Sequence, residues 1–191
     1  MVRRLGGVHV PRTGGTSLWT QLAAAFGDGF LADYAHDPIC GPYDMQPWPD
    51  GKTVIHGHFR PDLYNAELLI TWLRHPVDLV TSLWHTWLTL PPMHSALRKF
   101  HDMRPSLIEF AQWPEIRWLL SKTYFGGFDM RRFDFIGVFE RRDKDFLRLS
   151  HMLDVPLDPA IHENRSQRWN SSNELLDILA DDIAFYLTQT G

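Results

Sequence analysis

The chain contains the segment His9-Val10-Pro11-Arg12-Thr13-Gly14-Gly15-Thr16-Ser17-Leu18. It joins a predicted strand over residues 5–10 to a predicted amphipathic helix over residues 17–26. Glycines let the backbone approach an anion, and the free N–H groups at the start of a helix point toward it. This order of elements predicts a phosphate cradle at the end of a strand.

The side chains of this loop support the same prediction, because hydroxyl donors and a fixed positive charge flank the two glycines. The common kinase and ATPase loop has the pattern G-x-x-x-x-G-K-[ST], with a Lys directly after the glycines. Here no Lys follows the glycines, and the cation precedes them. We therefore predict a phosphate-binding loop of another kind. Its candidate cofactor-binding residues are Arg12, Thr13, Gly14, Gly15, Thr16 and Ser17.

The bulk composition limits the class of protein. The 191 residues are 44% hydrophobic and 22% charged, which predicts a single globular domain over 1–191. A net charge of −4 argues against non-specific nucleic-acid binding, which needs a basic surface. Cys40 is the single cysteine, so the sequence predicts neither an intrachain disulfide nor a cysteine-based metal cluster. No apolar run approaches the roughly 18 residues of a membrane span, and we expect a cytoplasmic protein.

Predicted strands alternate with predicted helices, which is typical of an α/β fold with a mostly parallel central sheet flanked by helices on both faces. The region 91–127 is rich in Trp and His and is predicted to be a helical insertion or lid, and 35–51 is predicted to be a loop. In such sheets ligands bind at the carboxyl ends of the strands. The predicted strands are 5–10, 53–58, 68–74 and 133–139, and the predicted helices are 17–26, 76–88, 106–112, 115–124, 144–153 and 173–187.

A second anion site is predicted where the strand 68–74 ends. Arg74 lies at that end, and Pro76 suits the first position of the next helix because it lacks the N–H that would be unpaired there. Ser82 lies four residues after Asp78 on the same helix face, where it and Arg74 could hold a phosphate. Alternatively, Arg74 pairs with Asp78 or another carboxylate and only fixes the turn.

With both motifs in order, the chain resembles the PAPS-dependent sulfotransferases. The segment 11–18 looks like the family's 5′-phosphosulfate loop, and 73–78 with Ser82 looks like its 3′-phosphate motif. The segments 56–59 and 133–140 are also similar. The closest likeness is to the carbohydrate branch that includes heparan sulfate 2-O-sulfotransferase, and it covers about 8–140.

The resemblance implies a P-loop-like three-layer sandwich that moves a sulfuryl group from PAPS to an acceptor hydroxyl, on a carbohydrate or small molecule, and releases PAP without a metal. Arg12 would stabilise the leaving oxygen. Arg165 and Arg168, in a polar loop before the last helix, would reach the nucleotide as the basic loop of related enzymes does. Two alternatives stay open: a P-loop nucleotide kinase or NTPase, and a non-catalytic nucleotide-binding relative, because Arg12 stands where many relatives have Lys.

His56 and His58 lie two residues apart on a predicted strand, so both side chains share one face. A sulfotransferase needs a base for the acceptor's proton, and histidine suits that role near neutral pH. Because the resembling branch uses its His-Gly-His segment in this way, we expect His58 to be the base, with His56 binding the acceptor or tuning His58. The reverse assignment, a metal site and two core histidines are the alternatives.

Overall fold

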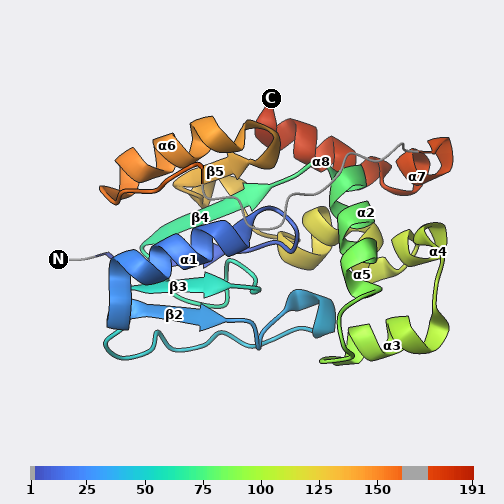
Figure 1. The fold of residues 1–191 in the computed structure, drawn as a ribbon, viewed down its shortest axis with the longest axis horizontal. Helices are drawn as coiled ribbons and strands as arrows, with labels where there is room; N and C mark the ends of the chain where they lie inside the picture. The colour runs from blue at the N-terminus through green and yellow to red at the C-terminus, as the bar shows by residue number, and fades with distance from the viewer. Residues whose placement is uncertain (1–2, 161–171) are drawn as a thin grey trace.

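The computed structural model describes residues 3–160 and 172–191, which form a parallel sheet flanked by helices (Figure 1). Its five strands lie in the order β2-β3-β1-β4-β5, and every pairing is parallel. This confirms the predicted α/β fold class. The strands are β1 (Leu5–Val8), β2 (Phe30–Asp33), β3 (Val54–Gly57), β4 (Leu68–Leu73) and β5 (Phe135–Val138).

Helices surround this sheet along the chain. The α-helices are α1 (Gly15–Phe26), α2 (Pro76–Trp87), α3 (Ser95–Met103), α4 (Leu107–Ala111), α5 (Pro114–Arg117), α6 (Arg142–Leu153), α7 (Asn173–Ile178) and α8 (Ala180–Thr190). A π-helical segment, η3, spans Leu119–Tyr124. Short 3₁₀ turns occur at η1 (Gly27–Gly29), η2 (Pro38–Cys40), η4 (Met130–Arg132) and η5 (Phe139–Arg141).

The alternation of side chains along the strands divides the core into two layers. On one face, Ile70 and Trp72 of β4 pack in a cluster with residues of α1 and α6, including Leu18 and Phe146. On the other face, Leu69 and Leu73 of the same strand join a larger cluster that includes α2, η3 and α8. The result is the three-layer sandwich that the sequence predicts, with the helices α3–α5 gathered beyond the carboxyl ends of the strands (Figure 1).

The register brings three strand ends together. Val8 of β1 lies opposite Gly57 of β3 and Thr71 of β4, so the segments that follow these strands meet at one edge of the sheet. The phosphate loop, His58 and Arg74 follow β1, β3 and β4 in turn. The topology therefore places both predicted anion motifs and the predicted base at the same edge.

Several elements differ from the sequence prediction. β2 was not predicted, because it is a four-residue edge strand with only Asp33 fully buried and so carries no alternating pattern. α3 lies inside the predicted insertion. The predicted helix 115–124 is broken into α5 and η3, where the Asp182 carboxylate accepts the backbone N–H groups of Leu120 and Ser121. The predicted helix 173–187 is divided at Leu179.

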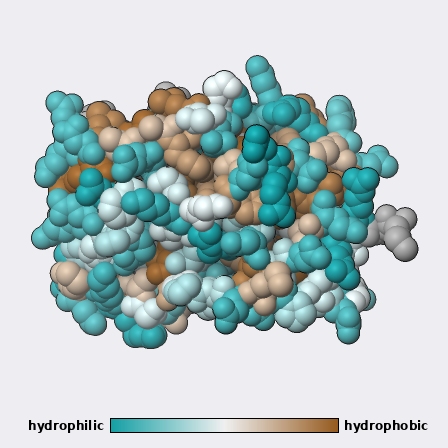
Figure 2. Space-filling model, turned by 180° about the vertical axis from the view of Figure 1, so that it is seen from behind, coloured by the Kyte–Doolittle hydropathy of each residue, from teal (hydrophilic) through white to brown (hydrophobic). Residues whose placement is uncertain are grey.

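Seen from the side opposite to Figure 1, the surface is mostly hydrophilic, with smaller hydrophobic areas between (Figure 2). This agrees with the concentration of apolar side chains in the two core clusters. In the part of the chain that the structure describes, no helix is long and apolar enough to cross a membrane.

Candidate functional site

The loop between β1 and α1 holds its backbone in an unusual conformation. Arg12 and Gly14 both have positive φ angles, 65° and 89°. A left-handed conformation is costly for a residue with a side chain, so at Arg12 the surrounding contacts must enforce it. The buried Thr13 hydroxyl donates to the Val10 carbonyl across the turn, at 2.8 Å. Gly14 caps α1 without any side-chain hydrogen bond, which leaves the first N–H groups of the helix to a ligand.

Gly15 is required by the packing of His9. A Cβ atom at Gly15 would overlap the His9 ring, so only glycine fits at the first residue of α1. Burial first, and then the charges of His58, His56 and Arg12, lower the pKa of His9 well below 6.5. His9 is therefore a neutral ring beneath the phosphate loop. It shapes the loop without adding charge to it.

Arg12 and Arg74 converge on this loop from two strand ends. Arg74 Nη1 donates to the Arg12 carbonyl oxygen at 3.0 Å, and Arg12 Nε donates to Ser82 Oγ at 2.9 Å. The Arg74 guanidinium also stacks on the Phe139 ring, 4.5 Å from its centroid. The two motifs predicted separately from the sequence therefore form one connected site.

No described carboxylate lies within 4.0 Å of either guanidinium. Arg74 is only 4% exposed, and its Nε is buried without a hydrogen-bond partner among the described residues. Burial lowers the pKa of Arg74, and the charge of Arg12 lowers it further, against the opposite effect of Asp78 and Glu140. Asp78 thus affects the pKa of Arg74 from a distance, and the direct Arg74–Asp78 ion pair that was the alternative prediction does not form.

Glu140 secures the turn that carries Arg74. Its carboxylate accepts the His75 N–H at 2.8 Å and the Tyr186 hydroxyl at 2.9 Å. His75 is the residue that caps α2, so Glu140 satisfies one of the unpaired N–H groups at this helix start. These contacts link α8 to the turn that follows β4. The position of Arg74 is therefore fixed by contacts with other parts of the fold.

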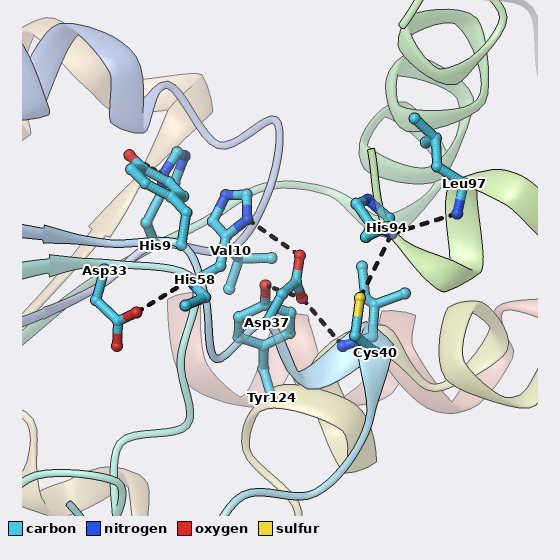
Figure 3. A network of polar contacts seen from close by, with 12 residues as sticks. His9, Val10, Asp33, Asp37, Cys40, His58, His94, Leu97 and Tyr124 are labelled. Carbon is cyan, nitrogen blue, oxygen red and sulfur yellow. Dashed lines mark hydrogen bonds and ion pairs between the residues drawn. The ribbon is translucent and has the colours of Figure 1, made fainter. Parts of the chain in front are cut away.

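His58 is paired with a carboxylate that the sequence analysis did not identify. Its Nδ1 lies 3.1 Å from Asp37 Oδ2, and the other carboxylate oxygen accepts the Tyr124 hydroxyl and the Ile39 N–H (Figure 3). Burial favours the neutral acid at Asp37, but the hydrogen bonds of His58, Ile39 and Tyr124 outweigh it and lower the carboxyl pKa. An ionised Asp37 makes Nδ1 of His58 the protonated nitrogen and leaves Nε2 as the acceptor of a proton.

His56 lies deeper in the same histidine cluster. Its ring stacks on that of His9 with 5.2 Å between centroids, and the centroid of the His58 ring lies 4.7 Å from that of His9. His56 is 2% exposed, and its Nδ1 is buried without a partner. Both predicted histidines therefore contact His9, and of the two His58 lines the cavity described below.

The buried His56 makes the stability of the fold depend on pH. Burial, followed by the charge of His58, lowers its pKa from 6.5 to about 3. Between these values the unfolded chain binds a proton that the folded chain does not, so the free energy of unfolding falls as the pH falls. From about pH 6.5 to 4.5 this one group should remove roughly 2 kcal/mol. Urea unfolding of His56→Leu should show a correspondingly smaller loss in the free energy of unfolding over the same pH range.

The exposed His151 provides the matched control for this measurement. His151→Leu should keep the pH dependence of the wild-type protein. An equal loss of stability in the wild type and in His56→Leu would show that His56 is not held neutral in the fold.

A cavity of about 740 Å³ opens in front of the phosphate loop and His58. Arg12, Gly14, Gly15 and Thr16 line one end of it, and His9, Tyr34 and Asp37 line the part around His58. Ser17 and Ser82 are buried behind this surface, at 2% and 4% exposure. The predicted Arg165 and Arg168 lie outside the described residues. The cavity therefore joins the predicted anion site to the predicted base.

Sequence reasoning missed Asp37, Tyr34 and Tyr124. Asp37 lies in the proline-containing segment 35–51, where it caps the turn η2 through Ile39. An Asp before Pro is an ordinary turn signal, so nothing local pointed to a partner for His58. Tyr124 comes from η3, 87 positions away from Asp37. These contacts depend on tertiary structure that the sequence pattern does not show.

Comparison with solved structures identifies the architecture. A sulfotransferase from Alicyclobacillus acidocaldarius matches with a TM-score of 0.50 and 14% identity, over 98% of this chain and 93% of that chain. The fold of this chain is similar to that of this sulfotransferase. The mouse sulfotransferase SULT7A1, in a structure complexed with PAP, matches with a TM-score of 0.42 and 16% identity, over 100% of this chain and 67% of that chain. No protein-family model and no curated protein matches the sequence.

Proposed function

We propose that this protein transfers a sulfuryl group from PAPS to an acceptor hydroxyl and releases PAP. The observation that carries the proposal is the convergence of Arg12 and Arg74 at the start of α1, with no described carboxylate beside either of them. A buried cation without a counter-ion destabilises a fold. An arrangement of this kind is understandable when the counter-ion is a ligand that carries anionic groups at two positions.

The chain offers suitable groups for both ends of PAPS. Arg12, Thr16 and the N–H groups at the start of α1 would hold the 5′-phosphosulfate, since hydrogen-bond donors and positive charge meet there. Arg74 and Ser82 would hold the 3′-phosphate, and the unpartnered Nε of Arg74 fits an additional anionic oxygen. Arg165 and Arg168 are proposed as further contacts of the nucleotide, from the resemblance alone.

His58 is proposed as the base. PAPS supplies the sulfuryl group: the acceptor oxygen forms a bond to sulfur as the bond from sulfur to the bridging phosphate oxygen breaks. His58 Nε2 takes the proton of the acceptor hydroxyl, and the phosphate oxygen keeps the electron pair of the broken bond. Arg12 neutralises the charge that develops on that oxygen, which is the kind of preorganised electrostatic stabilisation that lowers a barrier.

Asp37 is proposed to position His58 for this step. It accepts the Nδ1 proton of His58 and stabilises the imidazolium that forms when Nε2 takes a proton. Tyr124 and the Ile39 N–H hold the carboxylate in place, so the base is supported by two separate segments of the chain. His56 is proposed to tune His58 through the ring of His9 that lies between them.

Transfer itself tests this proposal. The protein is incubated with PAPS and a mixture of hydroxyl acceptors, both sugars and apolar alcohols, and the acceptors are examined by mass spectrometry. We expect one or more acceptors to gain a sulfuryl group as PAP appears. Phosphorylated acceptors from a parallel incubation with ATP and Mg²⁺, without sulfated ones from PAPS, would identify a kinase and contradict the proposal.

A further inference from the structure

The cavity continues past His58 into a region with few polar groups, and we infer that the acceptor is a largely apolar molecule that carries a hydroxyl. This inference rests on the proposed function, because it assigns the second substrate of the same site. It departs from the carbohydrate acceptor that the sequence resemblance favours.

One wall is a face of α2 and of the residues that follow it. Leu83, Thr86, Trp87 and Leu90 all line the cavity. Their spacing of three, four and seven positions is that of a single helix face. The Thr86 hydroxyl already donates to the Ser82 carbonyl at 2.8 Å, so it is not needed by a ligand. This wall therefore presents aliphatic and aromatic surface.

The facing wall also carries apolar side chains. Ile39, Cys40, Tyr43 and Met93 line it, and Ser95 and Arg98 add polar groups to the lining of the cavity. The Cys40 thiol lies 3.4 Å from His94 Nδ1, and the same nitrogen accepts the Leu97 N–H at the start of α3 (Figure 3). The Cys40 thiol and His94 Nδ1 are thus engaged with each other and with the helix cap.

Near the base, the remaining polar groups are occupied as well. The Asp37 carboxylate is used by His58, Tyr124 and the Ile39 N–H. The Tyr34 hydroxyl lies 3.4 Å from His9 Nδ1, and burial raises the pKa of Tyr34 to about 12, so it stays neutral. An acceptor hydroxyl can reach His58, whereas further hydroxyls beside the base or along α2 would meet apolar or already paired groups.

A carbohydrate is poorly suited to such a lining. Each of its hydroxyls gives up hydrogen bonds to water on entering, and each needs a new partner to offset that loss. Sugar-binding sites supply such partners from carboxylate and amide side chains. Among the described residues that line the cavity there is no Glu, Asn, Gln or Lys, and Asp37 is already engaged. A cavity of about 740 Å³ has the size of a typical small-molecule site.

The test compares 2-naphthol and cyclohexanol, as apolar hydroxyl compounds, with methyl glucoside and maltose. With PAPS present, kcat/KM for sulfation should be higher for the apolar pair than for the sugars by about 100-fold or more, since unpaired polar groups discriminate strongly. Leu90→Asn should raise KM for 2-naphthol about tenfold or more, with little change in kcat or in PAP affinity. The neighbouring exposed residue Thr89 does not line the cavity, and Thr89→Asn serves as the control.

A second variant covers the case in which Leu90→Asn fails to fold. Thr86→Val adds apolar surface to the same wall and should lower KM for 2-naphthol.

Higher kcat/KM for maltose than for 2-naphthol, or sulfation of neither apolar compound by a protein that binds PAP, would overturn the inference and leave nucleotide binding standing. If PAP does not bind at all, the proposed function fails. Calorimetric titration with 2-naphthol and methyl glucoside alone then still tests the cavity, and stronger binding of the glucoside would refute its apolar assignment.

Discussion

Arg74→Met is expected to weaken PAP binding by at least about 100-fold, roughly 2.7 kcal/mol, while the free energy of unfolding changes by less than about 1 kcal/mol or rises. Arg74 is 4% exposed and has no described carboxylate partner. A structural arginine in such a place would be a liability, since burial without a counter-ion is unfavourable. Methionine keeps the apolar stem of the side chain and removes that charge.

Two measurements separate the binding role of Arg74 from a structural one. Calorimetric titration gives the PAP affinity, and urea unfolding without nucleotide gives the stability. Arg131→Met is the control, because the Arg131 side chain is 90% exposed and its ion-pair partner in the described part of the chain is the surface residue Asp129. Arg131→Met changes the net charge by the same amount as Arg74→Met and should leave the PAP affinity unchanged. An unchanged PAP affinity in Arg74→Met, or a large loss of stability with normal affinity in the folded fraction, would remove Arg74 from the nucleotide site.

His58→Ala is expected to reduce the rate of sulfuryl transfer by about a thousandfold, while the PAP affinity stays within about threefold of the wild type. General-base catalysis contributes about 10²- to 10⁴-fold to enzymatic rates. The imidazole of His58 lines the cavity, and its Nδ1 is held by Asp37, so Nε2 is the nitrogen available to the acceptor. Removal of the ring leaves the phosphate loop intact, because its contacts run through Thr13, Arg74 and Ser82.

Asp37→Ala should give a smaller reduction than His58→Ala, about 10- to 100-fold in kcat, because the base remains but its imidazolium is less stabilised. Initial rates of PAP release at saturating PAPS measure both effects. The exposed His151 gives the control His151→Ala, which should turn over normally. Turnover by His58→Ala within tenfold of the wild type would assign the proton transfer to another group, and an equal loss in PAP affinity would make His58 part of the nucleotide site.

The loop between β1 and α1 and the turn that follows β4 could be predicted from the sequence because their signals are local. Glycines before a helix, and an Arg followed by Pro at the end of an apolar strand, report the backbone geometry within a few residues. The structure joins them through the contact of Arg74 with the Arg12 carbonyl, between residues 62 positions apart. That contact could be anticipated only from the parallel sheet, whose strand ends meet at one edge.

The partners of His58 could not be predicted in the same way. Asp37 lies in a segment whose composition indicates only turns, and Tyr124 lies in a π-helical segment that the Asp182 carboxylate stabilises from α8. The edge strand β2 could not be predicted either. It is a strand because its main chain pairs with β3, and its side chains follow no strand pattern. Local propensity is a weak guide wherever tertiary contacts select the conformation.

The most direct test of the account is the stoichiometry of sulfuryl transfer by the wild-type protein. PAPS, a hydroxyl acceptor and the protein are combined, and sulfated acceptor and PAP are quantified together by mass spectrometry. The account predicts equal amounts of the two products, formed at a rate that depends on the integrity of His58. PAP binding without any sulfated acceptor, or product formation that is unaffected in His58→Ala, would contradict it.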